Sequence, residues 1–296
     1  MPELPEVETI VRRLAGRLAG QRIERVHLAR RDIIHGHPVP IRAALRNRRI
    51  QQVERHGKAI RISLAEGWSL FVHLGMTGRL TLADRDQPVE AHTHLRLTFH
   101  RRRFELRFVD PRRFGAIWVV DSSRADGAWI GRRLPSAGAD PLKLPYARWR
   151  ALLQRRRQIK ALLLDQEPIS GVGNIYCDES LHRAGIHPLT LACDLDAARL
   201  RRLWRALRRV LAEAIRAGGS SVRDYRTADN TPGAFQHRHR VYHRAGQPCR
   251  RCQTPIQRIV VAGRGTFICP ACQPTPEEVA AMRITSGGLY ARRPPG

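Results

Sequence analysis

Four of the six cysteines form two pairs with the spacing of a metal site. Two residues lie between Cys249 and Cys252 and two between Cys269 and Cys272, and the segment 253–268 separates the pairs. Two such knuckles joined by a β-hairpin suit one tetrahedral ion, and thiolate ligands in this pattern favour zinc. We therefore predict one structural zinc ion. The lone cysteines Cys177 and Cys193 are not expected to bind it.

The N-terminus contains a possible nucleophile. Removal of Met1 would leave Pro2 with a free secondary amine beside Glu3 and Glu6. Such an amine can attack a sugar C1′ and form a Schiff base, and a nearby carboxylate can transfer the protons. The same residues also suit an ordinary helix start, because proline is accepted in the first turn and acidic side chains complement the helix dipole.

Two features could bind a phosphate. Alternating apolar residues predict strands at 256–261 and 266–268, with residues 263–265 at the tip of the hairpin and Arg264 projecting from it. The Gly-rich segment 171–174 precedes a predicted helix, whose free N–H groups would attract an anion. By themselves, a solvated turn arginine and a simple glycine turn are the more ordinary interpretations.

Two glycine-flanked turns each follow a predicted strand. Residues 73–78 read HLGMTG and residues 110–115 read DPRRFG, so Met76, Arg112 and Phe114 lie on turns of a basic chain. Apolar side chains next to arginine can act as wedges in a stack of bases. Packing of Met76 and Phe114 in a core is the alternative, and from residue type alone it is favoured.

The composition favours a nucleic-acid partner. Lys and Arg number 53 against 26 Asp and Glu, for a formal charge of +27 spread along the chain, and such a field attracts polyanions. A codon bias towards arginine is the other explanation, since lysine occurs only at Lys58, Lys143 and Lys160. The sequence has no run of ~18 apolar residues that would predict a membrane span, and its acidic N-terminus does not resemble a signal peptide. We expect a cytoplasmic protein, in keeping with reduced thiols.

The hydrophobic periodicity predicts an α+β fold. A helix at 9–18 precedes a β-rich region, and after Pro135 the pattern becomes helical, with the longest helix at about 195–217 capped by Asp194. The predicted strands are 23–28, 50–54, 59–64, 70–73, 94–99 and 104–109, and the other predicted helices are 147–153 and one from Asn174 to Gly185. The predicted domains are 1–134 (β-rich with a helix), 135–226 (helical), 227–273 (loop and zinc hairpin) and a disordered tail, 274–296.

Six segments, in this order, resemble the formamidopyrimidine-DNA glycosylase family over residues 1 to about 273. They are MPELPEVETI, HLGMTGRL, DPRRFG, GVGNIY, the DYR…PG…VYHR stretch and CxxC…GRGT…CPAC. The resemblance implies an N-terminal β-sandwich, a helix–two-turn–helix domain and a zinc finger, with damaged double-stranded DNA bound in the cleft between them by a monomer. It also implies removal of 8-oxoguanine and formamidopyrimidines, followed by β,δ-elimination of the abasic sugar.

The resemblance also implies roles for individual residues. Pro2 is the nucleophile, Glu3 exchanges protons at the sugar, and Glu6 supports them. Lys58 and Arg264 complete the catalytic set at the phosphates near the lesion. The implied DNA-binding residues are His92, Arg112, Lys160 and Asn174, and the implied wedge residues are Met76, Arg112 and Phe114. The segment from Tyr225 to Phe235 matches the loop that covers the extruded base.

The chain departs from the family pattern at Thr93, Cys177 and His243, where the family usually has Asp, Ala and Gly, and in the length of its tail. A related branch, the endonuclease VIII-like glycosylases, removes oxidised pyrimidines but usually begins Pro-Glu-Gly-Pro-Glu. Leu4 and the DPRRFG turn favour the purine branch. A non-catalytic DNA-binding relative is a further alternative, against which the intact Pro2 and Glu3 argue.

Overall fold

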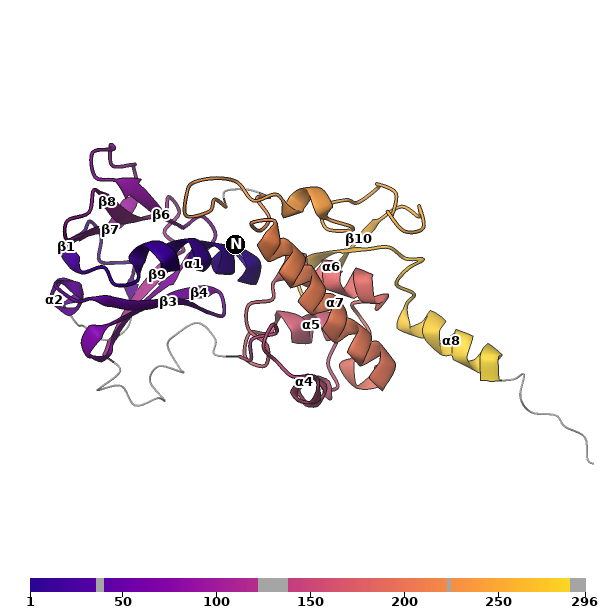
Figure 1. Ribbon diagram of the computed structural model, residues 1–296. Coiled ribbons are helices and arrows are strands. Elements are labelled where there is room, and N and C mark those ends of the chain that lie inside the picture. The colour runs from indigo at the N-terminus through magenta and orange to yellow at the C-terminus, as the bar shows by residue number, and fades with distance from the viewer. Residues whose placement is uncertain (36–39, 122–137, 223–224, 288–296) are drawn as a thin grey trace, which may run out of the picture. The chain divides into compact units, whose positions relative to one another are not determined.

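The computed structural model describes residues 1–35, 40–121, 138–222 and 225–287, the last six of these by their backbone alone. The chain divides into two compact units. Figure 1 shows the elements of both, coloured along the chain by residue number. Unit 1 consists of Met1–Asp140 and Leu211–Arg238, and unit 2 of Pro141–Val210 and His239–Gly296. This division cuts across the predicted domain boundaries, because the end of the longest helix and the segment after it belong with the N-terminal part.

Unit 1 contains two β-sheets. The first has the order β1-β7-β8-β6 and the second the order β2-β9-β5-β4-β3. Neighbouring strands are antiparallel except for β2 and β9. The strands are β1 (Ile23–Leu28), β2 (Ile34–His35), β3 (Ile50–His56), β4 (Ala59–Leu64), β5 (Trp68–His73), β6 (Arg79–Asp84), β7 (Thr93–Phe99), β8 (Phe104–Val109) and β9 (Ala116–Asp121).

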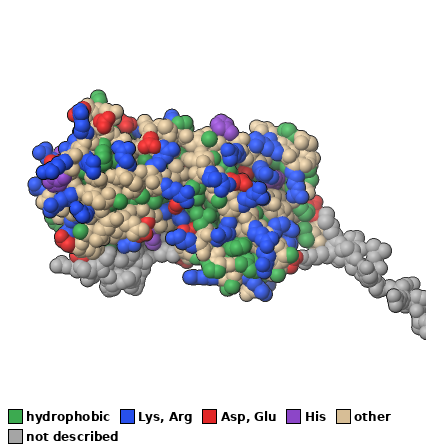
Figure 2. Space-filling view, in the orientation of Figure 1, with side chains coloured by type: hydrophobic (Ala, Val, Ile, Leu, Met, Phe, Trp, Pro, Cys, Tyr) green, Lys and Arg blue, Asp and Glu red, His purple; other side chains and the backbone are tan. Residues whose placement is uncertain are grey.

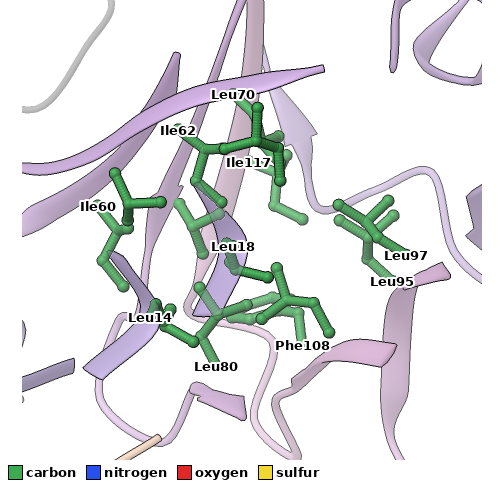
Figure 3. Packing of buried hydrophobic residues seen from close by; sticks show 14 of the residues in the cluster. Leu14, Leu18, Ile60, Ile62, Leu70, Leu80, Leu95, Leu97, Phe108 and Ile117 are labelled. Atoms are coloured by element: carbon green, nitrogen blue, oxygen red, sulfur yellow. The ribbon is translucent and has the colours of Figure 1, made fainter. Parts of the chain in front are cut away.

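One hydrophobic core joins the two sheets to the first helix, α1 (Leu4–Leu18). Figure 3 shows Leu14 and Leu18 of α1 next to side chains from both sheets, among them Ile60 and Phe108. The apolar residues of α1 recur at helical spacing, so one face of the helix is buried while its arginines stay at the surface. The helix begins five residues earlier than predicted, because Pro5 suits a first turn.

Unit 2 is helical apart from one hairpin. Its elements are α4 (Tyr146–Leu153), α5 (Ile159–Leu164), α6 (Asn174–Ala184), the short η2 (Ala192–Asp194), β10 (Gln257–Val261), β11 (Arg264–Ile268) and α8 (Pro276–Gly287). Helix α7 (Ala197–Arg216) runs from unit 2 into unit 1. Unit 1 also contains α2 (Ile41–Leu45), η1 (Ala65–Gly67) and η3 (Phe235–Arg238). The α+β fold is as predicted, although β2, β6, β9, α2 and α5 were not.

Two local predictions, the cap of α7 and the tip of the hairpin, need correction. Asp196, not Asp194, accepts a hydrogen bond from the N–H of Arg199 and caps α7 (2.8 Å). The hairpin turns at Ala262 and Gly263, both at positive φ, so Arg264 is the first residue of β11 and lies beside the tip.

The predicted disorder of the tail is wrong for residues 276–287, which form α8. Thr275 and Glu278 exchange side-chain-to-backbone hydrogen bonds of 2.7 and 3.2 Å, and this capping box starts the helix. The remaining tail, 288–296, lies outside the described residues.

The surface agrees with the strong positive charge of the sequence. Figure 2 shows Lys and Arg side chains over the visible face of each unit, with fewer Asp and Glu among them. Within the described residues, no helix combines the length and the apolar character that crossing a membrane would require.

Candidate functional site

The N-terminal residues are held tightly at the start of α1. Pro2 is buried, and only 4% of Glu3 is exposed. The carboxylate of Glu6 accepts the N–H of Glu3 through Oε2 (2.8 Å) and the N–H of Ser220 through Oε1 (2.7 Å). Glu6 therefore connects the N-terminus to the segment after α7, and its bonds to two backbone N–H groups give it a positioning role.

The segment after α7 is shaped to receive Glu6. Gly219 has a φ of +82°, and a Cβ there would lie 2.8 Å from Glu6 Oε1, so only glycine fits. The hydroxyl of Tyr225 donates to the carbonyl of Glu6 (3.3 Å). Burial and the nearby Glu6 carboxylate raise the pKa of Tyr225, so its hydroxyl keeps its proton. The sequence did not predict the contact between Glu6 and Ser220, because the two residues are 214 positions apart.

Lys58 lies in the turn between β3 and β4 and is 8% exposed. Ala59, the next residue, pairs with His73 at the end of β5. Burial, and secondarily the charge of Lys58, lower the pKa of His73. The imidazole of His73 accepts the N–H of Gly75 through Nδ1 (3.1 Å), so Lys58 lies near the base of the loop that contains Met76.

One buried carboxylate joins the two loops with the predicted wedge residues. Asp110, fully buried, accepts the hydroxyl of Thr77 (2.5 Å) and the N–H of Gly115 (2.7 Å). Gly75 lies so close to Phe114 that a Cβ would come within 2.4 Å of its carbonyl carbon. We call residues 73–78 and 110–115 the paired loops. An acidic residue directly after a buried strand of a basic chain was the available signal for Asp110.

The paired loops leave their predicted wedge residues exposed. Met76 is 37% and Phe114 53% exposed, and the guanidinium of Arg112 lies over the Phe114 ring, 4.6 Å from its centroid. These exposures contradict the alternative that Met76 and Phe114 are core residues. An apolar pair on a rigid base next to a cation has the character that a wedge in a base stack needs.

His92 is exposed just before β7, and its carbonyl accepts the N–H of Asp110 (3.0 Å). It borders a basic cavity of about 450 Å³ beside the paired loops. The cavity is lined by Ala29, Arg30, His92, Thr93, His94, Pro111 and Arg113. Histidine and arginine side chains around a hollow of this size suit a phosphate of a DNA backbone.

In unit 2, the structure brings Asn174 and the hairpin together. Asn174 is the first residue of α6, and its amide donates to the carbonyl of Gly265 (2.8 Å), next to the exposed Arg264. The positive end of the α6 dipole and a guanidinium therefore lie on neighbouring segments. This arrangement can hold one phosphate from two sides.

The environment of Lys160 does not suit the predicted role of binding a phosphate. It is fully buried, and its ammonium lies 2.6 Å from Asp178 Oδ1. Asp178 Oδ2 also accepts the N–H of Phe267 in β11 (3.0 Å). Burial raises the pKa of Asp178 to about 7, an effect that Lys160 opposes. Lys160 therefore neutralises a buried carboxylate that attaches α6 to the hairpin, and the side chain has no surface to offer DNA.

The four paired cysteines converge as a metal site requires. The Sγ atoms of Cys249, Cys252, Cys269 and Cys272 all lie within 4.8 Å of one another. Four thiols at this separation fit one tetrahedral zinc ion, and the site is a structural zinc site because no open ligand position is left. Cys177 is buried in α6 and Cys193 is exposed in η2, and neither belongs to the cluster.

Comparisons with known proteins match nearly the whole chain. Residues 1–117 match the formamidopyrimidine-DNA glycosylase N-terminal domain, 137–226 the H2TH domain of the same glycosylase, and 246–275 a zinc finger found in FPG and IleRS. These matches define a DNA glycosylase in which a helical domain is followed by a zinc finger.

Individual relatives agree over their full length. The formamidopyrimidine-DNA glycosylase of Solibacter usitatus is 44% identical over 275 residues, 92% of this chain and 99% of that protein. Among solved structures, the MutM (Fpg) protein of Thermus thermophilus has a TM-score of 0.79 at 42% identity, covering 92% of this chain and 98% of that one. Lactococcus lactis Fpg in complex with DNA containing an abasic site has a TM-score of 0.83 at 32% identity, covering 92% and 100%. The chain belongs to the formamidopyrimidine-DNA glycosylase family.

The zinc site leads to a first prediction. Elemental analysis of the purified chain should find one zinc ion per molecule, which Cys252→Ala should remove, because three thiolates leave the tetrahedral site open. Cys177→Ala and Cys193→Ala serve as controls and should retain the metal. A folded wild-type chain without zinc would refute the assignment.

A second prediction concerns Asp110. Asp110→Asn should lower the free energy of unfolding by about 1–3 kcal/mol, because an amide cannot accept both hydrogen bonds. Trypsin should then cleave faster after Arg112 or Arg113, as mapped by mass spectrometry. Asp86→Asn breaks an exposed pair with Arg103 and should cost at most ~1 kcal/mol without new cleavage in the paired loops. Equal cleavage of both variants would show that Asp110 does not hold these loops.

A third prediction separates the two roles considered for Lys160. Lys160→Met should destabilise unit 2 by about 3–5 kcal/mol, since it leaves Asp178 buried without its counter-charge. Lys160→Met combined with Asp178→Asn should recover most of that loss, because the amide can still accept the N–H of Phe267. The salt dependence of DNA binding should match wild type in the double variant. A log–log slope smaller by ~0.9 would instead reveal a lost phosphate contact.

Proposed function

We propose that this chain excises oxidised purines, 8-oxoguanine and formamidopyrimidines, from duplex DNA and then cuts the backbone by β,δ-elimination. The observation that supports it most directly is the buried N-terminal pair, Pro2 and Glu3, fixed at a helix start by Glu6. The solved relatives add support, since they include a Lactococcus lactis FPG mutant bound to DNA containing Fapy-dG and MutM bound to DNA containing carbocyclic 8-oxo-G.

Pro2 is the proposed nucleophile once Met1 has been removed. Its nitrogen attacks C1′, the bond from C1′ to the base breaks, and the base leaves with a proton. The proline nitrogen then loses its proton, the C1′–O4′ bond breaks, and O4′ takes up a proton from Glu3. The product is a Schiff base between the proline nitrogen and the opened sugar. An α-amino group titrates near ~8, against ~10.4 for a lysine side chain, so this amine is available near neutral pH. Glu3 exchanges protons at the sugar during these steps.

The elimination steps follow from the Schiff base. Loss of a C2′ proton expels the 3′ phosphate, and loss of a C4′ proton then expels the 5′ phosphate. Arg264, Asn174, Lys58 and His92 would hold the backbone phosphates. His92 and Arg264 are exposed, Asn174 is half-buried at the start of α6, and Lys58 is buried in the turn between β3 and β4. Met76, Arg112 and Phe114 would fill the space that the everted nucleotide leaves.

We also propose that the protein acts as a monomer in the cytoplasm. The tetrathiolate site favours a reducing compartment, where thiols stay available for zinc. Sedimentation of the chain with and without a lesion duplex would test the oligomeric state, and a dimer in either case would contradict it.

Borohydride trapping tests the proposed chemistry. The purified chain should form a covalent adduct with a duplex containing 8-oxoguanine opposite cytosine, and peptide mapping should place the DNA on residue 2. A form that retains Met1 should bind the duplex but trap nothing, because its Pro2 nitrogen is an amide. Glu3→Gln should bind normally while excision falls by about 10²–10⁴-fold.

Other outcomes would exclude this mechanism. An adduct at Lys58, or full activity with Met1 attached, would refute the role of Pro2. Trapping on a duplex with an oxidised pyrimidine but not on one with 8-oxoguanine would favour the endonuclease VIII-like activity. Binding of lesion DNA without any trapping would favour a non-catalytic DNA-binding protein.

A further inference from the structure

We infer that His182 is a positioning residue of the zinc centre. Its imidazole donates a hydrogen bond from Nε2 to Sγ of Cys249, which lowers the reactivity of this thiolate and attaches the metal site to α6. The inference concerns the zinc centre alone and does not depend on the proposed glycosylase activity.

The contact is short and excludes water. Nε2 of His182 lies 3.5 Å from Sγ of Cys249, and the two residues are 1% and 0% exposed. The N–H of Arg251 also points at this sulfur, at 3.4 Å. Cys249 therefore receives two N–H groups, and one of them comes from a side chain outside the zinc hairpin.

The surroundings of the ring determine which nitrogen carries the proton. Within the described part of the chain, Nδ1 of His182 is buried and has no hydrogen-bond partner. A proton on Nδ1 would bury an unsatisfied N–H and turn the lone pair of Nε2 towards an electron-rich sulfur. A proton on Nε2 avoids both costs and forms the N–H···S bond, so the Nε2–H tautomer is favoured.

His182 is the last of three residues on one face of α6 that contact the zinc hairpin and its knuckles. Asn174 donates to Gly265, Asp178 accepts the N–H of Phe267, and His182 meets Cys249. The three lie at positions i, i+4 and i+8, which a helix places in one row. A single helix face thus aligns the hairpin at its arginine end and its cysteine end.

Charge explains why the bond matters when zinc is bound. A zinc-bound cysteine is a thiolate, and an N–H donated to its sulfur withdraws electron density from it. The sulfur is then slower to take up a proton or to attack an alkylating agent, and the metal stays bound longer. Partners outside the ligand set usually change metal affinity by about 10–100-fold when they are removed.

Another cysteine supplies a matched control. Sγ of Cys252 lies 3.4 Å from the hydroxyl of Thr254, its side-chain partner outside the ligand set. The hydroxyl can donate to Cys252 when zinc binding makes this cysteine a thiolate, so Thr254→Val removes a donor there and leaves His182 untouched. The two variants should therefore alter different sulfurs of one metal site.

The test uses the full zinc-loaded chain. In His182→Phe, the zinc affinity measured by competition with a chromogenic chelator should fall by about 10–100-fold. Iodoacetamide, through which the sulfur gains a carbamidomethyl group and iodide leaves, should then modify Cys249 faster than it does in the wild-type chain. In His182→Gln the amide N–H can occupy the place of Nε2, and the affinity should return close to wild type. Thr254→Val should instead speed the alkylation of Cys252 and leave the rate at Cys249 as in the wild type.

Three results would overturn the inference. His182→Phe could release zinc at the wild-type rate with Cys249 no more reactive, or Phe and Gln could weaken zinc equally, which would indicate a packing role. The third test uses the wild-type chain, so it remains available if a variant does not fold. Loaded with NMR-active cadmium, it should show the His182 proton on Nε2, with scalar coupling to the metal through Cys249, whereas a proton on Nδ1 would contradict the inference.

Discussion

A carboxylate can be buried only where hydrogen-bond donors replace its lost water, and the functional parts of this chain are built on that constraint. Glu6 joins the N-terminus to the segment after α7, and Asp110 joins the paired loops. In unit 2, Asp178 and Glu179 attach α6 to the zinc-binding region, since Glu179 accepts the backbone N–H groups of residues 240–242. Each of these acids bridges segments that are distant in sequence.

Because of the same constraint, acidic and basic residues have different roles in this chain. With 53 basic and 26 acidic side chains, the chain has a surplus of arginine for its surface. These four acids lie in the interior, where most of their partners are backbone N–H groups, so they fix geometry without neutralising the exposed guanidinium groups. The positive field at the surface and the hydrogen bonds that fix the interior are therefore provided by different residues.

Much of the fold was predictable because it depends on short-range patterns. Strands such as 59–64 and the end of α6 at Gly185 follow from alternation and from a glycine with positive φ. The cysteine spacing predicted the zinc site for the same reason.

Features that depend on contacts between distant residues could not be predicted from such local patterns. The sequence around Lys160 does not reveal that Asp178 faces it in the interior. A glycine on each side of Arg264 suggested a tip at 263–265, but Ala262 takes the left-handed conformation and moves the turn by one residue. Pro2, Glu3 and the wedge residues came from the family resemblance, because their local sequence also suits an ordinary helix start or core.

The bond between Glu6 and Ser220 has a consequence for biosynthesis. Glu6 is synthesised 214 residues before Ser220, so this hydrogen bond cannot form while the nascent chain is still short. Until Ser220 emerges, the start of α1 lacks the donor for one oxygen of Glu6. A nascent chain that ends before Ser220 would therefore present the segment around Glu6 before its final geometry is fixed.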